Sequence, residues 1–168
     1  MKYILQTSRI QFSRLSELDF DFLFEYHSDL ELTKFLPLGK PYPKEKVKNY
    51  LTNRIKHWEK HNFGTYSLTL KETKEKIGYC GLEYVGDTDY IDIRFGVSRN
   101  YWGKGLATEA VQACIDNGFN KHHLDIIYGA AAPENIGSIN ILKKIGMRKT
   151  DIVNFYGNVV DYFLIKKT

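Results

Sequence analysis

The chain has 168 residues, which is enough for one domain with a sizeable core. Hydrophobic residues make up 43% and aromatic residues 14% of the sequence, and this composition excludes a disordered chain. The net charge of +4 suits an anionic ligand, but the lysines are dispersed and do not indicate nucleic-acid binding. The bulk properties therefore favour a globular, mildly basic protein.

The first half of the chain predicts a strand, two helices and three further strands. Apolar and polar residues alternate over residues 9–15, and Ser16 with Asp19 resembles the capping box that begins a helix. That helix is expected to bury Leu18, Phe22, Leu23 and Tyr26. After a loop rich in proline, helical spacing over residues 44–60 places four residues on one face, Val47, Leu51, Ile55 and Trp58. Short polar turns then separate predicted strands at 65–70, 77–85 and 90–97.

The second half alternates helices and strands. A glycine-rich turn opens a helix whose apolar residues recur at helical spacing, namely Ala107, Ala110, Val111, Cys114, Ile115, Gly118 and Phe119. A strand at 125–132, a helix that Gly146 ends, and strands near 148–153 and 159–166 complete the chain. We therefore predict a single domain over residues 1–168 of the α/β (α+β) class. Its mixed, mostly antiparallel and twisted sheet of about seven strands is expected to carry helices on both faces.

Cysteine and histidine residues predict no disulfide framework and no metal centre. Cys80 and Cys114 lie in apolar segments, so we expect buried and inert thiols. His57 and His61 are four residues apart on a predicted helix and could share a face, but no carboxylate completes a zinc signature. We interpret the five histidines as surface residues. No segment has the length or apolarity of a membrane span or a signal peptide, so we expect a cytoplasmic protein without membrane partners.

The segment from Trp102 to Glu109 is the strongest indication of a binding site. Gly103 and Gly105 carry no Cβ, so the backbone can approach a ligand closely. The unpaired N–H groups and the positive dipole end of the following helix would then face an anion. The loop is not a P-loop, because Gly-Lys is not followed by serine or threonine at the required spacing. It also lacks the third glycine and the acidic residue of a dinucleotide fingerprint.

Two motifs lie about thirty residues apart, one over residues 101–110 and one from Asn135 to Ser138. Together they resemble the GNAT N-acetyltransferase superfamily, in particular its RimJ/RimL-like branch of ribosomal-protein N-alpha-acetyltransferases. Residues 101–110 are similar to that branch's acetyl-CoA motif, with Trp102 where the superfamily has glutamine or arginine. Asn135 to Ser138 followed by residues 142–147 is similar to the second motif, and residues 77–82 resemble the third strand. The resemblance covers nearly the whole chain. It implies acetyl-CoA as the acetyl donor and a primary amine, a protein N-terminus or a small molecule, as the acceptor.

The resemblance also implies where the donor binds. The backbone of Val97 and its neighbours would bond the pantetheine arm and face the thioester carbonyl. The pyrophosphate would lie against the loop and the first helical turn, which comprise Trp102, Gly103, Lys104, Gly105, Leu106, Ala107 and Thr108. Asn135 would bond the pantetheine or simply cap its helix. Ser138 would lie near the sulfur, and Lys143 or Lys144 would reach the ribose phosphate.

Direct attack by an amine requires a general base and a proton for the departing thiolate, but no protein nucleophile. Many relatives donate that proton from a tyrosine seven residues after the asparagine, which is Leu142 here. Ser138 or solvent would then protonate the thiolate. Glu83 and Asp92, on adjacent predicted strands, are the candidates for the base, directly or through a water. Alternatively, Asp92 forms a surface ion pair with Arg94.

Several aromatic residues either line the acceptor site or belong to the core, namely Tyr79, Tyr84, Phe95 and Tyr156. The leucine at position 142 keeps a second class of function open, a non-catalytic acetyl-CoA-binding module that senses the cofactor or scaffolds a partner. Nucleic-acid binding is disfavoured because the sequence carries no helix-turn-helix, zinc or aromatic-plus-basic motif. Many members of the resembled superfamily are dimers, so a homodimer is a further expectation.

Overall fold

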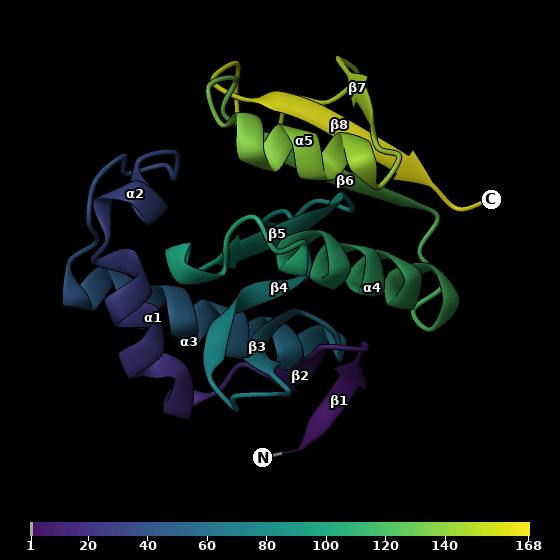
Figure 1. Cartoon of the computed structure of the whole chain (residues 1–168). Coiled ribbons are helices and arrows are strands. Elements are labelled where there is room, and N and C mark those ends of the chain that lie inside the picture. Colours follow the sequence, from purple (N-terminus) through teal and green to yellow (C-terminus); the bar gives the residue numbers. More distant parts are fainter. Residues whose placement is uncertain (1) are drawn as a thin grey trace.

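The computed structural model describes residues 2–168, and within them the strands form one eight-stranded sheet in the order β1-β2-β3-β4-β5-β6-β8-β7 (Figure 1). The strands are β1 (Tyr3–Gln6), β2 (Ile10–Arg14), β3 (Thr65–Leu70), β4 (Lys76–Tyr84), β5 (Ile91–Val97), β6 (Ile126–Ala131), β7 (Arg148–Thr150) and β8 (Asp161–Lys166). The helices are α1 (Phe20–His27), α2 (Leu30–Thr33), α3 (Lys44–His61), α4 (Leu106–Asn120) and α5 (Ile136–Lys144). All neighbouring strands are antiparallel except β5 and β6.

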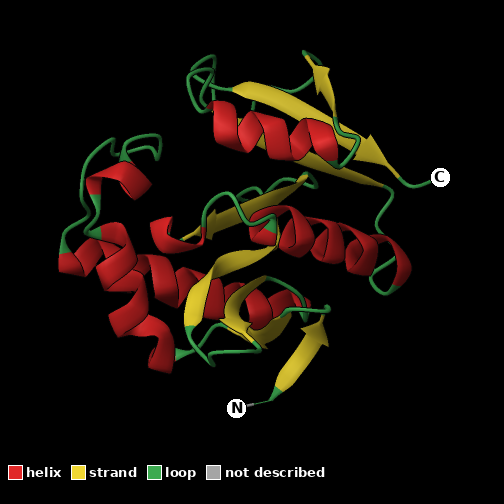
Figure 2. Ribbon diagram, in the orientation of Figure 1, coloured by secondary structure: helices red, strands yellow, loops and turns green. Residues whose placement is uncertain are grey.

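The predicted fold class is confirmed, with helices on both faces of a mixed sheet (Figure 2). The sequence did not reveal β1, because this edge strand leaves Tyr3 and Ile4 exposed and shows no buried alternation. It also did not reveal α2, a single turn of four residues that is too short to show a helical period. None of the helices in the described part of the chain is long and apolar enough to cross a membrane.

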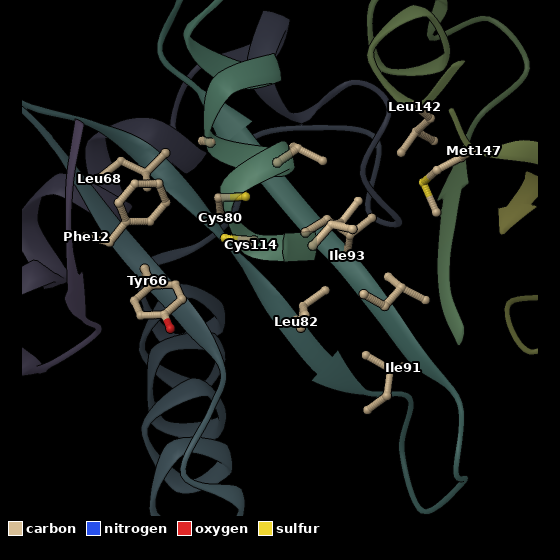
Figure 3. Close-up of a cluster of buried hydrophobic side chains, with 14 of the residues drawn as sticks. Phe12, Tyr66, Leu68, Cys80, Leu82, Ile91, Ile93, Cys114, Leu142 and Met147 are labelled. Atoms are coloured by element: carbon tan, nitrogen blue, oxygen red, sulfur yellow. The ribbon is translucent and has the colours of Figure 1, made fainter. Parts of the chain in front are cut away.

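Two hydrophobic clusters lie on opposite faces of the sheet. The larger one packs α4 and α5 against the strands, and Figure 3 shows part of it. Cys80 and Cys114 lie in this cluster as buried free thiols, as predicted, and Figure 3 shows them near each other. Gly118 allows α4 to lie close to β4, because a Cβ there would collide with Leu82. The second cluster packs α1 and α3 against the other face.

Two local predictions were wrong. The capping box is present, with the amide of Ser16 donating to Asp19 Oδ2 at 2.9 Å, but it caps a 3₁₀ turn that precedes α1. Leu18 lies in that turn rather than on the buried helix face and is 79% exposed. The histidines are not all at the surface, since His27 is fully buried and its Nδ1 lies 2.7 Å from the carbonyl oxygen of Leu23. Burial lowers the pKa of His27, so the ring is neutral at pH 7.

The sheet opens between β5 and β6. β4 pairs with β5 along seven residues, from Tyr84 opposite Ile91 to Gly78 opposite Val97. By contrast, β5 and β6 share only one pair, Asp92 opposite Tyr128. Beyond Asp92 the two parallel strands diverge, so among residues 2–168 no strand pairs with the edge of β5 from Ile93 to Val97 on that side. Backbone N–H and C=O groups need hydrogen-bonding partners. This edge therefore offers a strand-like surface to a ligand that carries amide groups.

His57 joins α3 to the end of β4. Its Nδ1 lies 2.9 Å from the carbonyl oxygen of Phe63, and its Nε2 accepts a hydrogen bond from the Tyr84 amide at 3.0 Å. A carbonyl only accepts and an amide only donates, so both contacts require the neutral ring with its proton on Nδ1. Burial, with smaller effects from His61 and Arg54, lowers the pKa of His57 to about 4.

We expect the protein to lose about 2 kcal/mol of stability through His57 as the pH falls from 6.5 to 4. In that range the unfolded chain binds a proton at this histidine and the folded chain does not. The figure is discounted because the ring is only half-buried. The measurement is urea unfolding at pH 7.5 and 4.5 of the wild type and of His57→Phe, which should lose this part of the pH dependence. His123→Asn, at an exposed site, should keep it, and an equal slope in His57→Phe would contradict the assignment.

Candidate active site

The glycine loop places the start of α4 at the end of β5. Gly103 and Gly105 have φ angles of +71° and +74°, in the left-handed region that favours glycine. Gly105 is the residue that precedes the first turn of α4, and it has no side chain to cap that turn. The amides at the beginning of a helix have no intrahelical partners. Together with the helix dipole, they make this turn a site for an anion.

Two sets of hydrogen bonds hold the loop. Glu109, in the first turn of α4, accepts hydrogen bonds from Thr7 Oγ1 at 2.5 Å and from Arg9 Nε at 2.6 Å. Arg9 Nη1 also donates to the carbonyl oxygen of Lys104 at 2.8 Å. Burial tends to raise the pKa of Glu109, but the hydrogen bonds from Thr7 and Arg9 outweigh it and lower the pKa. On the other side, Trp102 Nε1 donates to the carbonyl oxygen of Val97 at 2.7 Å.

Arg9 and Glu109 are residues that sequence reasoning missed. Arg9 is remote from the loop in the sequence and matches no motif, so nothing in the sequence brings it to the site. Glu109 is the last residue of the segment from Trp102 to Glu109, but a glutamate in the first turn of a helix is common and does not by itself indicate a site. Its hydrogen bonds tie the β1–β2 turn to the loop and fix the position of the anion site.

A groove of about 730 Å³ runs from the glycine loop along the open edge of β5 to the start of α5. The predicted cofactor-binding residues that line it are Val97, Trp102, Gly103, Gly105, Leu106, Ala107, Thr108, Asn135 and Ser138. Lys104 does not line the groove, and its Nζ lies 5.4 Å from the ring centroid of Tyr101. Tyr26 and Tyr79 border the groove beside Gly96, and Leu32, Phe35 and Leu36 border it near α2.

Asn135 and Ser138 lie at the first turn of α5. Asn135 Oδ1 accepts a hydrogen bond from the Ser138 amide at 3.2 Å, so Asn135 caps its helix. Ser138, Ile141 and Lys144 lie along the groove, whereas Lys143 does not line it. Leu142 belongs to the core and is fully buried. A Cβ at Gly129 would lie only 3.0 Å from Leu142 Cδ2, so this side chain packs on β6.

Glu83 and Asp92 face each other across β4 and β5, but neither lines the groove. Glu83 Oε1 accepts a hydrogen bond from Thr65 Oγ1 at 2.7 Å. Its Oε2 lies 3.1 Å from Arg54 Nε and 3.4 Å from Arg94 Nη1. Arg94 Nε also donates to Asp92 Oδ1 at 3.2 Å. This is the ion pair that the sequence offered as the alternative to a role for Asp92 as the base. Asp92 is buried, however, and the pair does not lie on the surface.

This polar network carries two carboxylates and two guanidinium groups. Burial raises the pKa of Glu83, and the charges of Arg54 and Arg94 offset part of the increase. A raised pKa would suit a general base, but both oxygens of Glu83 are engaged and the carboxylate lies outside the groove. The Tyr156 hydroxyl, from the β7–β8 connection, donates to Asp92. The network thus joins α3, β4, β5 and that connection.

The family is decided by the match of residues 9–148 to the model described as the acetyltransferase (GNAT) domain. The chain belongs to the GNAT acetyltransferase family. It is 31% identical over 166 residues to the uncharacterised N-acetyltransferase p20 of Bacillus licheniformis, covering 95% of this chain and 93% of that protein. The acetyltransferase of Agrobacterium tumefaciens str. C58 has the same fold, with a TM-score of 0.89, 18% identity, and coverage of 99% and 95% of the two chains. RimL, the ribosomal L7/L12 alpha-N-protein acetyltransferase in complex with coenzyme A, aligns with a TM-score of 0.81, 11% identity and 98% coverage of both chains.

The GNAT protein is an acetyl-CoA-dependent N-acetyltransferase, and its groove fits that donor. Acetyl-CoA combines an anionic pyrophosphate with a pantetheine arm that carries amide groups. The first turn of α4 suits the former, and the unpaired edge of β5 suits the latter. The predicted superfamily, donor and enzyme class are confirmed.

Proposed function

We propose that this GNAT protein acetylates the free α-amino group of a peptide or protein, as in the RimJ/RimL-like branch. The observation that carries the proposal is the character of the groove next to α2. The groove as a whole is lined by two carboxylates and two lysines, with Glu31 and Lys34 at the α2 end and Glu134 and Lys144 at the α5 end. Lys34 is already paired with Glu31 at 2.7 Å. The resemblance of residues 101–110 and of the Asn135–Ser138 turn to the RimJ/RimL-like branch supports the same acceptor class.

Charge balance separates this acceptor from polycations. A polyamine or aminoglycoside carries several positive charges and would require an excess of carboxylates around it. The groove has no such excess, and its wall near α2 consists of Leu32, Phe35 and Leu36. The apolar wall suits the first side chains of a peptide. The small number of charges suits its single ammonium group, which must lose its proton before the amine attacks.

We propose the following roles for the site residues. Acetyl-CoA supplies the acetyl group as a thioester. The amides of Gly103 to Thr108 bind the pyrophosphate, and the open edge around Val97 orients the pantetheine arm. Ser138 donates a hydrogen bond to the sulfur as it leaves. Neither Glu83 nor Asp92 reaches the groove, so neither carboxylate contacts the amine. They accept its proton only through water, and they hold strands β4 and β5 in position.

Replacement of Ser138 by alanine should lower turnover at least tenfold while changing the KM for acetyl-CoA less than threefold. A general-acid group typically contributes about 10²–10⁴-fold, and the lower bound allows for partial rescue by solvent. Asn140→Ala, at an exposed site on the same helix, is the matched control and should keep full turnover. Steady-state release of free CoA thiol measures both variants. Unchanged turnover in Ser138→Ala would remove this hydroxyl from the mechanism.

The acceptor class is tested by measuring thiol release from acetyl-CoA with three kinds of amine. These are short peptides with free N-termini, the same peptides with acetylated N-termini, and the polyamine spermidine. We expect transfer only to the free N-termini, with mass spectrometry showing a single added acetyl group. Transfer to spermidine alone, or to lysine side chains in the blocked peptides, would contradict the proposal.

A further inference from the structure

The reaction requires a donor for the oxygen of the thioester, because negative charge develops there when the amine attacks. In many relatives a tyrosine on α5, at the position that Leu142 occupies here, protonates the departing thiolate. Leu142 is fully buried in the core and carries no donor. The structure presents other phenols at the groove, and one of them comes from a helix on the opposite face of the sheet.

Tyr26, in the last turn of α1, reaches β5 at Gly96. A Cβ at position 96 would overlap the Tyr26 hydroxyl, so that hydroxyl occupies the space that a side chain on β5 would fill. Gly96 lies between Phe95 and Val97 on the open edge of β5, and all three residues line the groove. Tyr26 is 6% exposed and lines the same groove. The Tyr26 hydroxyl thus lies beside the end of β5. The resemblance to the superfamily implies that the thioester carbonyl binds at this end of the strand.

The surroundings of Tyr26 hold its ring and its proton in place. The ring packs edge-on against Tyr79, with centroids 5.3 Å apart. Tyr79 pairs with Gly96 across β4 and β5, so both phenols meet the same point of the strand. Burial strongly raises the pKa of Tyr26, which keeps the hydroxyl protonated at any physiological pH. A phenol held in this way is a fixed hydrogen-bond donor in a largely dry site.

We propose that Tyr26 is a catalytic residue whose hydroxyl donates a hydrogen bond to the thioester carbonyl oxygen during acetyl transfer. The proton stays on the phenol. The nitrogen–carbon bond forms, the carbon–sulfur bond breaks, and Tyr26 stabilises the negative charge that the oxygen carries in between. The proposal rests on the function proposed above, and it adds a residue from α1 to a site otherwise built from β5, α4 and α5.

The test is Tyr26→Phe, which removes one oxygen atom and leaves the ring packing intact. Titration calorimetry of the full chain with acetyl-CoA and with CoA needs no acceptor. A hydrogen bond to the carbonyl should make acetyl-CoA bind about 3–10-fold more weakly in the variant, while CoA affinity stays within twofold. Turnover should fall about 100-fold, the typical loss for one oxyanion donor. Tyr42→Phe, in the same aromatic cluster but outside the groove, should match the wild type in all three measurements.

Equal losses for acetyl-CoA and CoA, or no loss of acetyl-CoA affinity together with unchanged turnover, would overturn the role of Tyr26. Failure of the proposed function is distinguishable. A wild type that acetylates a different amine, or none, contradicts the acceptor, and the comparison of acetyl-CoA with CoA still decides the contact between Tyr26 and the carbonyl.

Discussion

Replacing Ala107 with aspartate is expected to weaken acetyl-CoA binding at least a hundredfold without unfolding the protein. Ala107 is the second residue of α4 and lines the groove at the anion site. A carboxylate about 4 Å from a phosphate costs roughly 4 kcal/mol at an effective dielectric constant of 20. The same carboxylate interacts favourably with the helix dipole, by about 0.3–1 kcal/mol. Binding and stability should therefore respond in different ways.

Ala107→Asn is the matched control, because asparagine has nearly the same shape as aspartate and no charge. We expect it to bind acetyl-CoA within about tenfold of the wild type, the cost of fitting a larger side chain into the groove. Titration calorimetry measures affinity, and thermal melting without ligand measures stability. Equal affinities for the aspartate and asparagine variants would show that no phosphate lies against the first turn of α4.

The second large effect is expected from Glu83→Gln, which should lower the free energy of unfolding by about 3–5 kcal/mol. The Glu83 side chain is 2% exposed, and those of Arg54 and Arg94 are 13% and 23% exposed. Loss of the carboxylate leaves two largely buried guanidinium groups with Asp92 as their remaining anion. Acetyl-CoA affinity should change less than threefold, because Glu83 lies outside the groove.

Urea unfolding compares Glu83→Gln with Glu45→Gln, which removes an exposed carboxylate near the start of α3 and should change stability by less than 0.5 kcal/mol. The experiment also separates two roles for Glu83. Normal stability with lost turnover would identify it as the general base that the sequence indicated. Lost stability with turnover reduced only in proportion to the folded fraction would identify it as a residue that holds α3, β4 and β5 together.

The sequence predicted most of the elements because their patterns are local. β3 at 65–70 matches its predicted bounds, and the helical spacing after Gly105 is that of α4. The glycine loop was predicted from backbone chemistry at a helix start, and the Asn135–Ser138 turn from its resemblance to the second superfamily motif. β1 was not predicted because this edge strand buries too little to show a period. α2 was not predicted because a helix of four residues is too short to show one.

The parts of the site that remained hidden depend on contacts between distant segments. The divergence of β5 from β6 has no sequence signal, because it is a property of strand pairing. Arg9 and Tyr26 reach the loop and Gly96 from other elements of the fold. Glu83 and Asp92 were predicted to lie on adjacent strands, and they do. The pair of Asp92 with Arg94 was one of the alternatives, but the sequence could not show that Arg54 and Thr65 engage Glu83 away from the groove.

We infer that acetyl-CoA binds between the open edge of β5 and the first turn of α4. The most direct measurement is a set of thermal melts of the wild type with acetyl-CoA, CoA, ATP and NAD. A ligand at a hundred times its Kd adds about 2.7 kcal/mol, or several degrees for a chain of this length. Binding at this site predicts this shift with acetyl-CoA and CoA and none with ATP or NAD. No shift with acetyl-CoA, or an equal shift with all four, would contradict it.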